Sequence, residues 1–385
     1  MIAPARLRIG FAALLLGSVA VTACGGEGSS GPDPVASGTP PPSPTPTPSP
    51  TPTPSPTPTP SGTAAFEPVV AAIDAYDDTD FAVWVGDADG TVFTYTKGSF
   101  DTAQQYQIAS ATKWYSAAVM QRLVDRGVLA LDDRPQQYLD YWTSDPADPR
   151  SRVTLTQLLS FTSGFGDPPG VADSCVDRAG LTLQECVGQI YRQGISDEPG
   201  TVFSYGPDHL HIAAAMAERA TGQGFAQLLQ SELVAPLGMQ GGTRFAFPSQ
   251  ANPRAAGGAV STAADYSRFL AALLRGDLFA DTQAFTAVRT QDAETNFRPS
   301  AAEQFGDWRY AFGSFVVCDK QAFDSECAAD GVNTSPGSFG WTPWVDRKTG
   351  YWGLIARRGD TGSATIPVAL SVELRPLIEG ALARR

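Results

Sequence analysis

Ser110-Ala111-Thr112-Lys113 stands where an extended segment, Gln105-Tyr106-Gln107-Ile108, gives way to an apolar helix. Residues three apart share a helix face, so this spacing brings the Lys113 amine within reach of the Ser110 hydroxyl. A lysine whose pKa is lowered can take the serine proton and create a nucleophile. Free N–H groups at the helix start would stabilise developing negative charge. The alternative is a helix-capping Ser110 with a solvated Lys113.

The elements around this stretch predict an α+β fold. Strands come first, a helical middle follows, and strands and a terminal helix end the chain. That order indicates a sheet flanked by helices with an all-helical insertion, in which 110–126 is the buried central helix. The expected elements are helices at 65–76, 110–126, 154–160, 208–220, 225–233, 263–274 and from Ile366, and strands at 81–86, 91–96, 311–317, 340–345 and 350–357.

The first 23 residues have the pattern of an export signal. Arg6 and Arg8 precede an apolar run that is too short to span a membrane stably. The run ends in Val21-Thr22-Ala23-Cys24-Gly25, which resembles a bacterial lipobox. We therefore expect cleavage before Cys24, a lipid on its thiol, and a membrane-anchored protein in the extracytoplasmic envelope. The alternative is an ordinary signal peptide with an incidental cysteine.

Residues 24–64 are predicted to form a linker, and 65–385 the folded domain. From Pro40 to Pro60, proline occupies every even position and alternates mainly with threonine and serine. Such a run adopts an extended polyproline-II conformation of about 3.1 Å per residue, so it would span about 60 Å. The linker would hold the domain away from the membrane.

Charge and cysteine usage narrow the function classes. The net charge of −13 and the lack of a basic cluster argue against a nucleic-acid partner. Besides Cys24 the chain has Cys175, Cys186, Cys318 and Cys327, which allow three pairings. Their short spacings favour two local disulfides, 175–186 and 318–327, in an oxidising compartment. A zinc site is the alternative, but no C-x-x-C occurs.

Several segments resemble the serine β-lactamase-like and penicillin-binding-protein-like hydrolases, in particular the branch of class C β-lactamases and esterases. They are 127–133 (GVLALDD), 158–165 (LLSFTSGF), 236–239 (PLGM) and 257–265 (GGAVSTAAD). The resemblance covers about 66–380. It implies the β-lactamase/transpeptidase-like fold, with an antiparallel sheet, and acyl-enzyme chemistry on Ser110 with Lys113 as base. It implies no metal and no cofactor.

The second motif of this family, Tyr-x-Asn, corresponds here to Tyr205-Gly206-Pro207. The tyrosine is present, and Pro207 replaces the asparagine and suits the first turn of the helix that follows. We expect Tyr205 to move protons if the charge of Lys113 lowers the phenol pKa. The alternative is an aromatic residue that only packs.

The third motif, Lys/His-Thr-Gly, has two candidates. Lys348-Thr349-Gly350 is literal, but it lies between two apolar strands, where a turn is expected. The better match is Ser335-Pro336-Gly337, with Ser338 following. The resemblance then assigns the oxyanion hole to the N–H groups of Ser110 and Ser338. Phe339 and Trp341 either belong to the strand core or, beside this segment, line an acyl pocket.

The chain has no G-x-S-x-G motif, so neither histidine, His209 or His211, is expected to act as the base of a Ser-His-Asp triad. We expect helix-surface or loop-packing roles for them, with one of them near the pocket. Because Ser335 is uncharged, the sequence favours a serine hydrolase acting on a neutral ester or amide. The alternatives are DD-peptidase or β-lactamase activity, with cell-wall peptides as substrates, or a catalytically silent binding module of the same fold.

Overall fold

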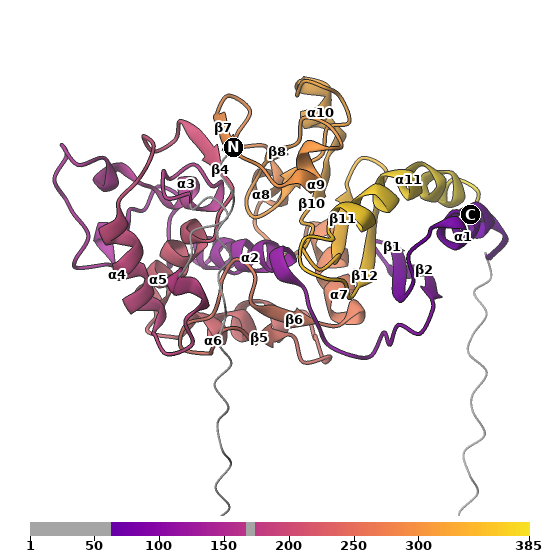
Figure 1. Ribbon diagram of the computed structural model, residues 1–385, viewed down its shortest axis with the longest axis horizontal. Helices are drawn as coiled ribbons and strands as arrows, with labels where there is room; N and C mark the ends of the chain where they lie inside the picture. The colour runs from indigo at the N-terminus through magenta and orange to yellow at the C-terminus, as the bar shows by residue number, and fades with distance from the viewer. Residues whose placement is uncertain (1–62, 167–173) are drawn as a thin grey trace, which may run out of the picture. The chain divides into compact units, whose positions relative to one another are not determined.

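A computed structural model describes residues 63–166 and 174–385 (Figure 1). The expected signal peptide, Cys24 and the linker up to residue 62 lie outside the described residues. The described part is built on a seven-stranded antiparallel sheet in the order β2-β1-β12-β11-β10-β9-β8. Its strands are β1 (Phe81–Asp87), β2 (Gly90–Lys97), β8 (Arg309–Tyr310), β9 (Phe315–Val316), β10 (Val332–Thr334), β11 (Thr342–Asp346) and β12 (Tyr351–Arg357).

Helices cover both faces of this sheet. Alternate residues of a strand point to opposite faces, so Phe81, Val83 and Val85 pack under α1 (Glu67–Ala75) and α11 (Thr365–Leu382). Ala82 faces the other way, into the larger core with α7 (Ala263–Arg275). Figure 1 shows α11 and α7 on opposite sides of β11 and β12. The expected α+β class is confirmed.

The helical part gathers around α2 (Thr112–Asp125). Every residue from Thr112 to Gln121 is buried, because the helix lies between the sheet side and the other helices (Figure 1). The prediction of a buried central helix is therefore correct. The helix packs against α5 (Asp208–Thr221) and α6 (Phe225–Leu229), which continues as a π-turn over Gln230–Val234. In turn, α3 (Leu155–Leu159) and α4 (Leu183–Gln193) pack against α5.

Two small sheets, the helix α4 and three short helices were not predicted. β3 (Tyr106–Gln107) pairs with β6 (Ala259–Ser261), and β6 with β5 (Arg244–Phe245), all antiparallel. β4 (Val202–Ser204) pairs in parallel with β7 (Glu294–Phe297). These pairings join segments far apart in sequence, so local patterns do not reveal them. The short helices are α8 (Thr282–Thr286), α9 (Ser300–Glu303) and α10 (Ser325–Asp330).

The expected strand at 311–317 is wrong in one respect. β8 ends at Tyr310 and β9 begins at Phe315, with a turn between them. Gly313 has a φ of +68° in that turn, a conformation that suits glycine and interrupts the apolar run. β10 was also missed, because it is only three residues long.

Both expected disulfides are present. Cys175 is bonded to Cys186 with a Cα–Cα distance of 5.3 Å, and Cys318 to Cys327 with 5.1 Å. Each closes a local loop, and the bonded sulfurs are unavailable as metal ligands. No helix in 63–166 or 174–385 is long and apolar enough to cross a membrane.

Candidate active site

The N-terminal end of α2 is held by a strand and a strained residue. Ile108 N–H donates to the Ala259 carbonyl (3.2 Å), and Ala259 N–H donates to Thr112 Oγ1 (3.2 Å). Ala109 has a φ of +44°, which is uncommon for a residue other than glycine. Ser110 follows in a short 3-10 turn, Ala109–Ala111, so α2 starts two residues later than expected. The turn leaves the Ser110 side chain partly accessible.

Lys113 points back to Ser110, as the spacing predicts. Its Nζ lies 3.0 Å from Ser110 Oγ and donates to the Ala256 carbonyl at 2.7 Å. The residue is only 5% exposed, and no carboxylate pairs with it among the described residues. Burial lowers the pKa of Lys113 well below its usual value, and the nearby Arg254 charge lowers it further. A neutral amine beside a serine hydroxyl is the form that a general base requires.

Tyr205 lies on the other side of this amine. Lys113 Nζ sits 4.6 Å from the centroid of the Tyr205 ring, over its face. Burial raises the pKa of the phenol, and the Ser110 side chain opposes that rise. The expectation that Lys113 lowers the phenol pKa is therefore wrong, because burial of the Tyr205 ring outweighs any such effect. A neutral phenol donates a proton more readily than it accepts one.

The segment at 335–338 lies beside the nucleophile. Ser335 Oγ donates to the carbonyls of Ser110 (3.2 Å) and Gly313 (3.1 Å). A Cβ on Gly337 would come within 2.2 Å of the Ile108 carbonyl oxygen, so only glycine permits this approach. Within the described part of the chain no acceptor takes the N–H of Ser338. This is the N–H that the resemblance assigns to the oxyanion hole.

The two aromatic residues after Ser338 differ in burial. Phe339 is half-buried and keeps accessible surface near this segment. Trp341 is fully buried and packs on Tyr266 with a centroid distance of 6.1 Å. The expectation that Trp341 lines an acyl pocket is therefore wrong, and Trp341 belongs to the core.

Lys348-Thr349-Gly350 forms a turn, as expected. The N–H groups of Lys348 and Thr349 both donate to Asp346 Oδ1 at 2.9 Å, and Gly350 has a φ of +81°. The Lys348 side chain is 67% exposed and forms an ion pair with Asp330 at 2.7 Å. No contact links this turn to Ser110 in the described structure.

Some residues around the site were not identified from the sequence, or were placed wrongly. His209 and His211 are both fully buried, so a helix-surface position is wrong for each of them. Ala256 accepts from Lys113 through its carbonyl, which no side-chain pattern reveals. Arg254, from the same loop, contributes a positive charge near Lys113 and pairs with Asp177 at 2.9 Å. α5 begins at Asp208, which makes Pro207 its N-cap.

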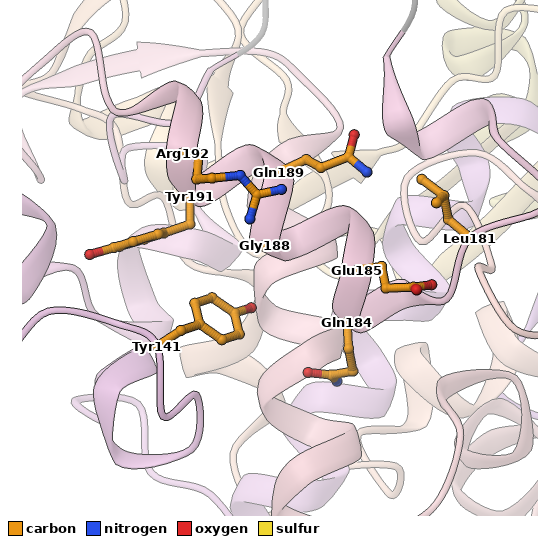
Figure 2. A pocket seen from close by; sticks show the side chains of 8 residues that line it. All are labelled: Tyr141, Leu181, Gln184, Glu185, Gly188, Gln189, Tyr191 and Arg192. Carbon is orange, nitrogen blue, oxygen red and sulfur yellow. The ribbon is translucent and has the colours of Figure 1, made fainter.

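A hollow of about 610 Å³ lies elsewhere, along α4 (Figure 2). Tyr141, Gln184 and Arg192 are among its lining residues. None of the predicted site residues lines it, so it is separate from the Ser110 constellation. No group of three or more His, Cys, Asp or Glu side chains suited to a metal occurs within the described ranges.

Comparisons with known proteins agree with the fold. A protein-family model described as Beta-lactamase matches residues 69–364. The chain is 32% identical over 160 residues to Penicillin-binding protein 4 of Amycolatopsis lactamdurans, covering 40% of this chain and 39% of that protein. It is 33% identical over 147 residues to Esterase EstB of Burkholderia gladioli, covering 35% and 37% respectively. The matches thus span less than two-fifths of these relatives.

Among solved structures, a β-lactamase from Mycobacterium bovis superposes with a TM-score of 0.59. The superposition covers 81% of this chain and 99% of that one at 23% sequence identity. At that identity the likeness concerns the fold alone, which is the β-lactamase/transpeptidase-like arrangement described above.

Proposed function

This chain belongs to the beta-lactamase family, and from that premise we propose that it is a serine hydrolase forming an acyl-enzyme on Ser110. The observation that carries the proposal is the 3.0 Å contact between Ser110 Oγ and the Lys113 amine. Burial favours the neutral amine, because it lowers the pKa of Lys113. A neutral amine within hydrogen-bond distance can remove the serine proton as the hydroxyl attacks.

In the acylation step, Ser110 Oγ bonds to the substrate carbonyl carbon and its proton passes to Lys113. The carbonyl oxygen becomes negative and accepts hydrogen bonds from the N–H groups of Ser110 and Ser338. The tetrahedral intermediate then expels the leaving group, which takes the phenolic proton of Tyr205. The products are the acyl-enzyme, a lysine ammonium, a tyrosine phenolate and the free alcohol or amine.

In the deacylation step, the Tyr205 phenolate removes a proton from water, and the hydroxide attacks the acyl carbon. The Ser110 oxygen leaves and recovers its proton from the Lys113 ammonium. The phenolate and ammonium form close together, so each charge stabilises the other in a site with little water. The cycle returns both side chains to their neutral state.

For the substrate we propose a neutral ester, or a neutral amide. The segment beside Ser110 offers Ser335, whose hydroxyl is already engaged by two carbonyls and which carries no charge. Phe339 supplies apolar surface nearby. The similarity to Esterase EstB supports this choice.

A second candidate, DD-peptidase or β-lactamase activity, is favoured by Arg254. This side chain is 41% exposed, and its Nε lies 3.7 Å from the point that a Cβ on Gly257 would occupy. The carbonyl carbon of Ala109, bonded to Ser110 N, lies 3.8 Å from that same point. A positive charge at this place suits a substrate carboxylate. The similarity to Penicillin-binding protein 4 supports it.

A substrate panel tests these proposals. Purified protein and Ser110→Ala are compared on p-nitrophenyl butyrate, nitrocefin and a D-Ala-D-Ala peptide. We expect turnover of the butyrate ester that is lost in Ser110→Ala. Preferred turnover of nitrocefin or the peptide establishes the second candidate. Covalent capture without turnover of any substrate establishes the silent binding module, and unchanged hydrolysis in Ser110→Ala contradicts the Ser110 mechanism altogether.

We also propose that the protein is anchored to the bacterial envelope through a lipid on Cys24. The lipobox-like sequence supports the anchor, and the two disulfides suit an oxidising extracytoplasmic compartment. Expression of the full chain followed by detergent phase separation tests the anchor. The wild type should enter the detergent phase, and Cys24→Ser should stay in the aqueous phase. Equal partitioning of the two proteins contradicts the proposal.

A further inference from the structure

His209 is fully buried next to Ser204, the residue that precedes Tyr205. It lies in the first turn of α5, four residues after Tyr205, and α5 packs against α2 and α3 (Figure 1). Histidine is seldom fully buried, and this imidazole takes no part in the reaction described above. Both ring nitrogens nevertheless have partners.

The hydrogen bonds of His209 define its tautomer. Nε2 lies 2.9 Å from the Ser204 carbonyl oxygen, which can only accept, so Nε2 carries the proton. Nδ1 lies 2.7 Å from Ser163 Oγ and in the neutral ring must accept from that hydroxyl. Burial lowers the pKa of His209 to about 4. The ring is therefore neutral at ordinary pH, and both bonds persist.

The peptide groups next to Tyr205 are fixed from both sides. Ser204 N–H donates to the Phe161 carbonyl at 3.1 Å, while His209 holds the Ser204 carbonyl. Tyr205 N–H donates to the Phe297 carbonyl at 3.1 Å. Of these restraints, only the one from His209 comes from a side chain.

The Phe161 ring adds a packing restraint. It stacks on His209 with a centroid distance of 4.8 Å and an interplanar angle of 11°, and lies 5.6 Å from the Tyr205 ring. Phe161 has a φ of +60°, an uncommon backbone conformation for a phenylalanine. That strain persists only if the surroundings enforce it, which indicates that the stacked position is maintained by the fold.

We propose that His209 is a positioning residue that holds the Ser204 carbonyl and the Phe161 ring so that the Tyr205 phenol is aligned for proton transfer. The inference rests on the proposed role of Tyr205 as proton donor to the leaving group. Proton transfer is sensitive to small displacements of donor and acceptor. Loss of the Nε2–H bond would thus impair leaving-group protonation while Ser110 and Lys113 stay in place.

Two neutral substitutions separate the hydrogen bond from mere packing. In His209→Gln the amide reaches the Nε2 position and can still donate to the Ser204 carbonyl. In His209→Asn the shorter amide reaches only the Nδ1 position. The matched control is His211→Asn, in the same helix, because His211 is also fully buried but does not hold the Ser204 carbonyl, which His209 does.

The measurement is kcat/KM for p-nitrophenyl butyrate and ethyl butyrate, since kcat/KM reports acylation. Nitrophenolate departs without a proton, whereas ethoxide needs one. We expect His209→Asn to lose about 10-fold or more on ethyl butyrate and much less on the nitrophenyl ester, and Tyr205→Phe should show the same pattern. His209→Gln should stay near the wild type on both esters. His211→Asn should change both by the same factor.

Equal losses on the two esters in His209→Asn would overturn the positioning role. A loss on ethyl butyrate in His209→Gln as large as that in His209→Asn would also overturn it. Failure of the proposed function gives a different result from failure of the positioning role. In the former case Ser110→Ala retains hydrolysis, or the loss in Tyr205→Phe does not depend on the leaving group. Thermal unfolding of each variant shows whether it is folded. If His209→Asn does not fold, Ser163→Ala decides instead, because it removes the hydrogen bond that holds Nδ1. A larger loss on ethyl butyrate than on the nitrophenyl ester supports the positioning role, and equal losses on the two esters overturn it.

Discussion

Lys113 and Lys348 both stand in stretches that match motifs of the same family, yet their surroundings are opposite. Lys113 is 5% exposed, contacts a hydroxyl and a carbonyl, and has a pKa lowered by burial. Lys348 is 67% exposed, and its hydrogen bond to Asp330 raises its pKa. The comparison teaches that a short motif identifies a candidate, while burial and partners decide whether the amine is a base or a solvated cation.

The largest difference between the two lysines should appear when each amine is removed in turn. Lys113→Met should lower kcat/KM for p-nitrophenyl butyrate by about 10²- to 10⁴-fold, the usual contribution of a general base. Lys348→Met should leave kcat/KM unchanged, because its side chain lies in a surface turn. A comparable loss in both variants would show that the two lysines do not differ in function.

The glycines of the two candidate third motifs offer a second comparison. Gly337→Ala would place a Cβ within 2.2 Å of the Ile108 carbonyl, so the backbone before Ser110 must move. We expect kcat/KM to fall by about 10- to 100-fold, because small displacements at a reacting centre have effects of this size.

Gly350→Ala is the matched control for that substitution. Its added Cβ would meet no atom within 4 Å, and only its φ of +81° is unfavourable. The substitution should destabilise the fold by about 1 kcal/mol and leave the rate unchanged. Activity loss confined to Gly350→Ala would mean that Lys348-Thr349-Gly350 is the functional motif after all.

The dependence of kcat/KM on pH tests whether the pKa of Lys113 is lowered, in contrast to that of Lys348. The base form of Lys113 is required, so kcat/KM should rise up to tenfold per pH unit below its folded pKa and then level off. Because burial and Arg254 lower that pKa, the plateau begins below the range of an ordinary lysine. Arg254→Ala should move the rising limb to higher pH. An unmoved limb would exclude Arg254 as a contributor.

The smallest expected effect is on stability. Above the lowered pKa of Lys113 the folded state has lost a proton that an unfolded lysine keeps up to about pH 10.4. Stability in that interval therefore rises with pH, and burial of the amine destabilises the fold at neutral pH. Lys113→Met should increase the free energy of unfolding by about 1 kcal/mol or more, at about 1.4 kcal/mol per pH unit of lowering.

Chemical unfolding at neutral and alkaline pH measures this difference. The slope with pH should be weaker in Lys113→Met than in the wild type, and Lys348→Met should keep the wild-type slope. A Lys113→Met protein that is less stable than the wild type would contradict the burial argument.

The sequence was sufficient where the physics is local. The helix after Ser110, the turn at 346–350 and both short disulfide loops depend on spacing and turn chemistry, and the structure confirms them. The direction of the Tyr205 pKa shift was predicted wrongly, because it depends on burial by distant segments. The Ala256 carbonyl acts through its backbone, so its contact with Lys113 leaves no trace in residue types.

The histidines show the same limit. His209 was expected to lie on the helix surface or to pack against a loop, but α5 turns it inward against Ser163 and Phe161, both more than 40 residues earlier. The signal that would have helped is local: the polar residue Ser163, in the 158–165 segment that carries Phe161. Pairing it with His209 requires the packing of α3 on α5, which only the tertiary structure gives.

Labelling with a fluorophosphonate, followed by peptide mass mapping, tests the central claim most directly. The wild type and Lys348→Met should each gain one adduct, located on Ser110, at the same rate. Lys113→Met should label at least about 100-fold more slowly. An adduct on another residue, or equal labelling in Lys113→Met, would contradict the account of Ser110 as a nucleophile activated by a buried neutral lysine.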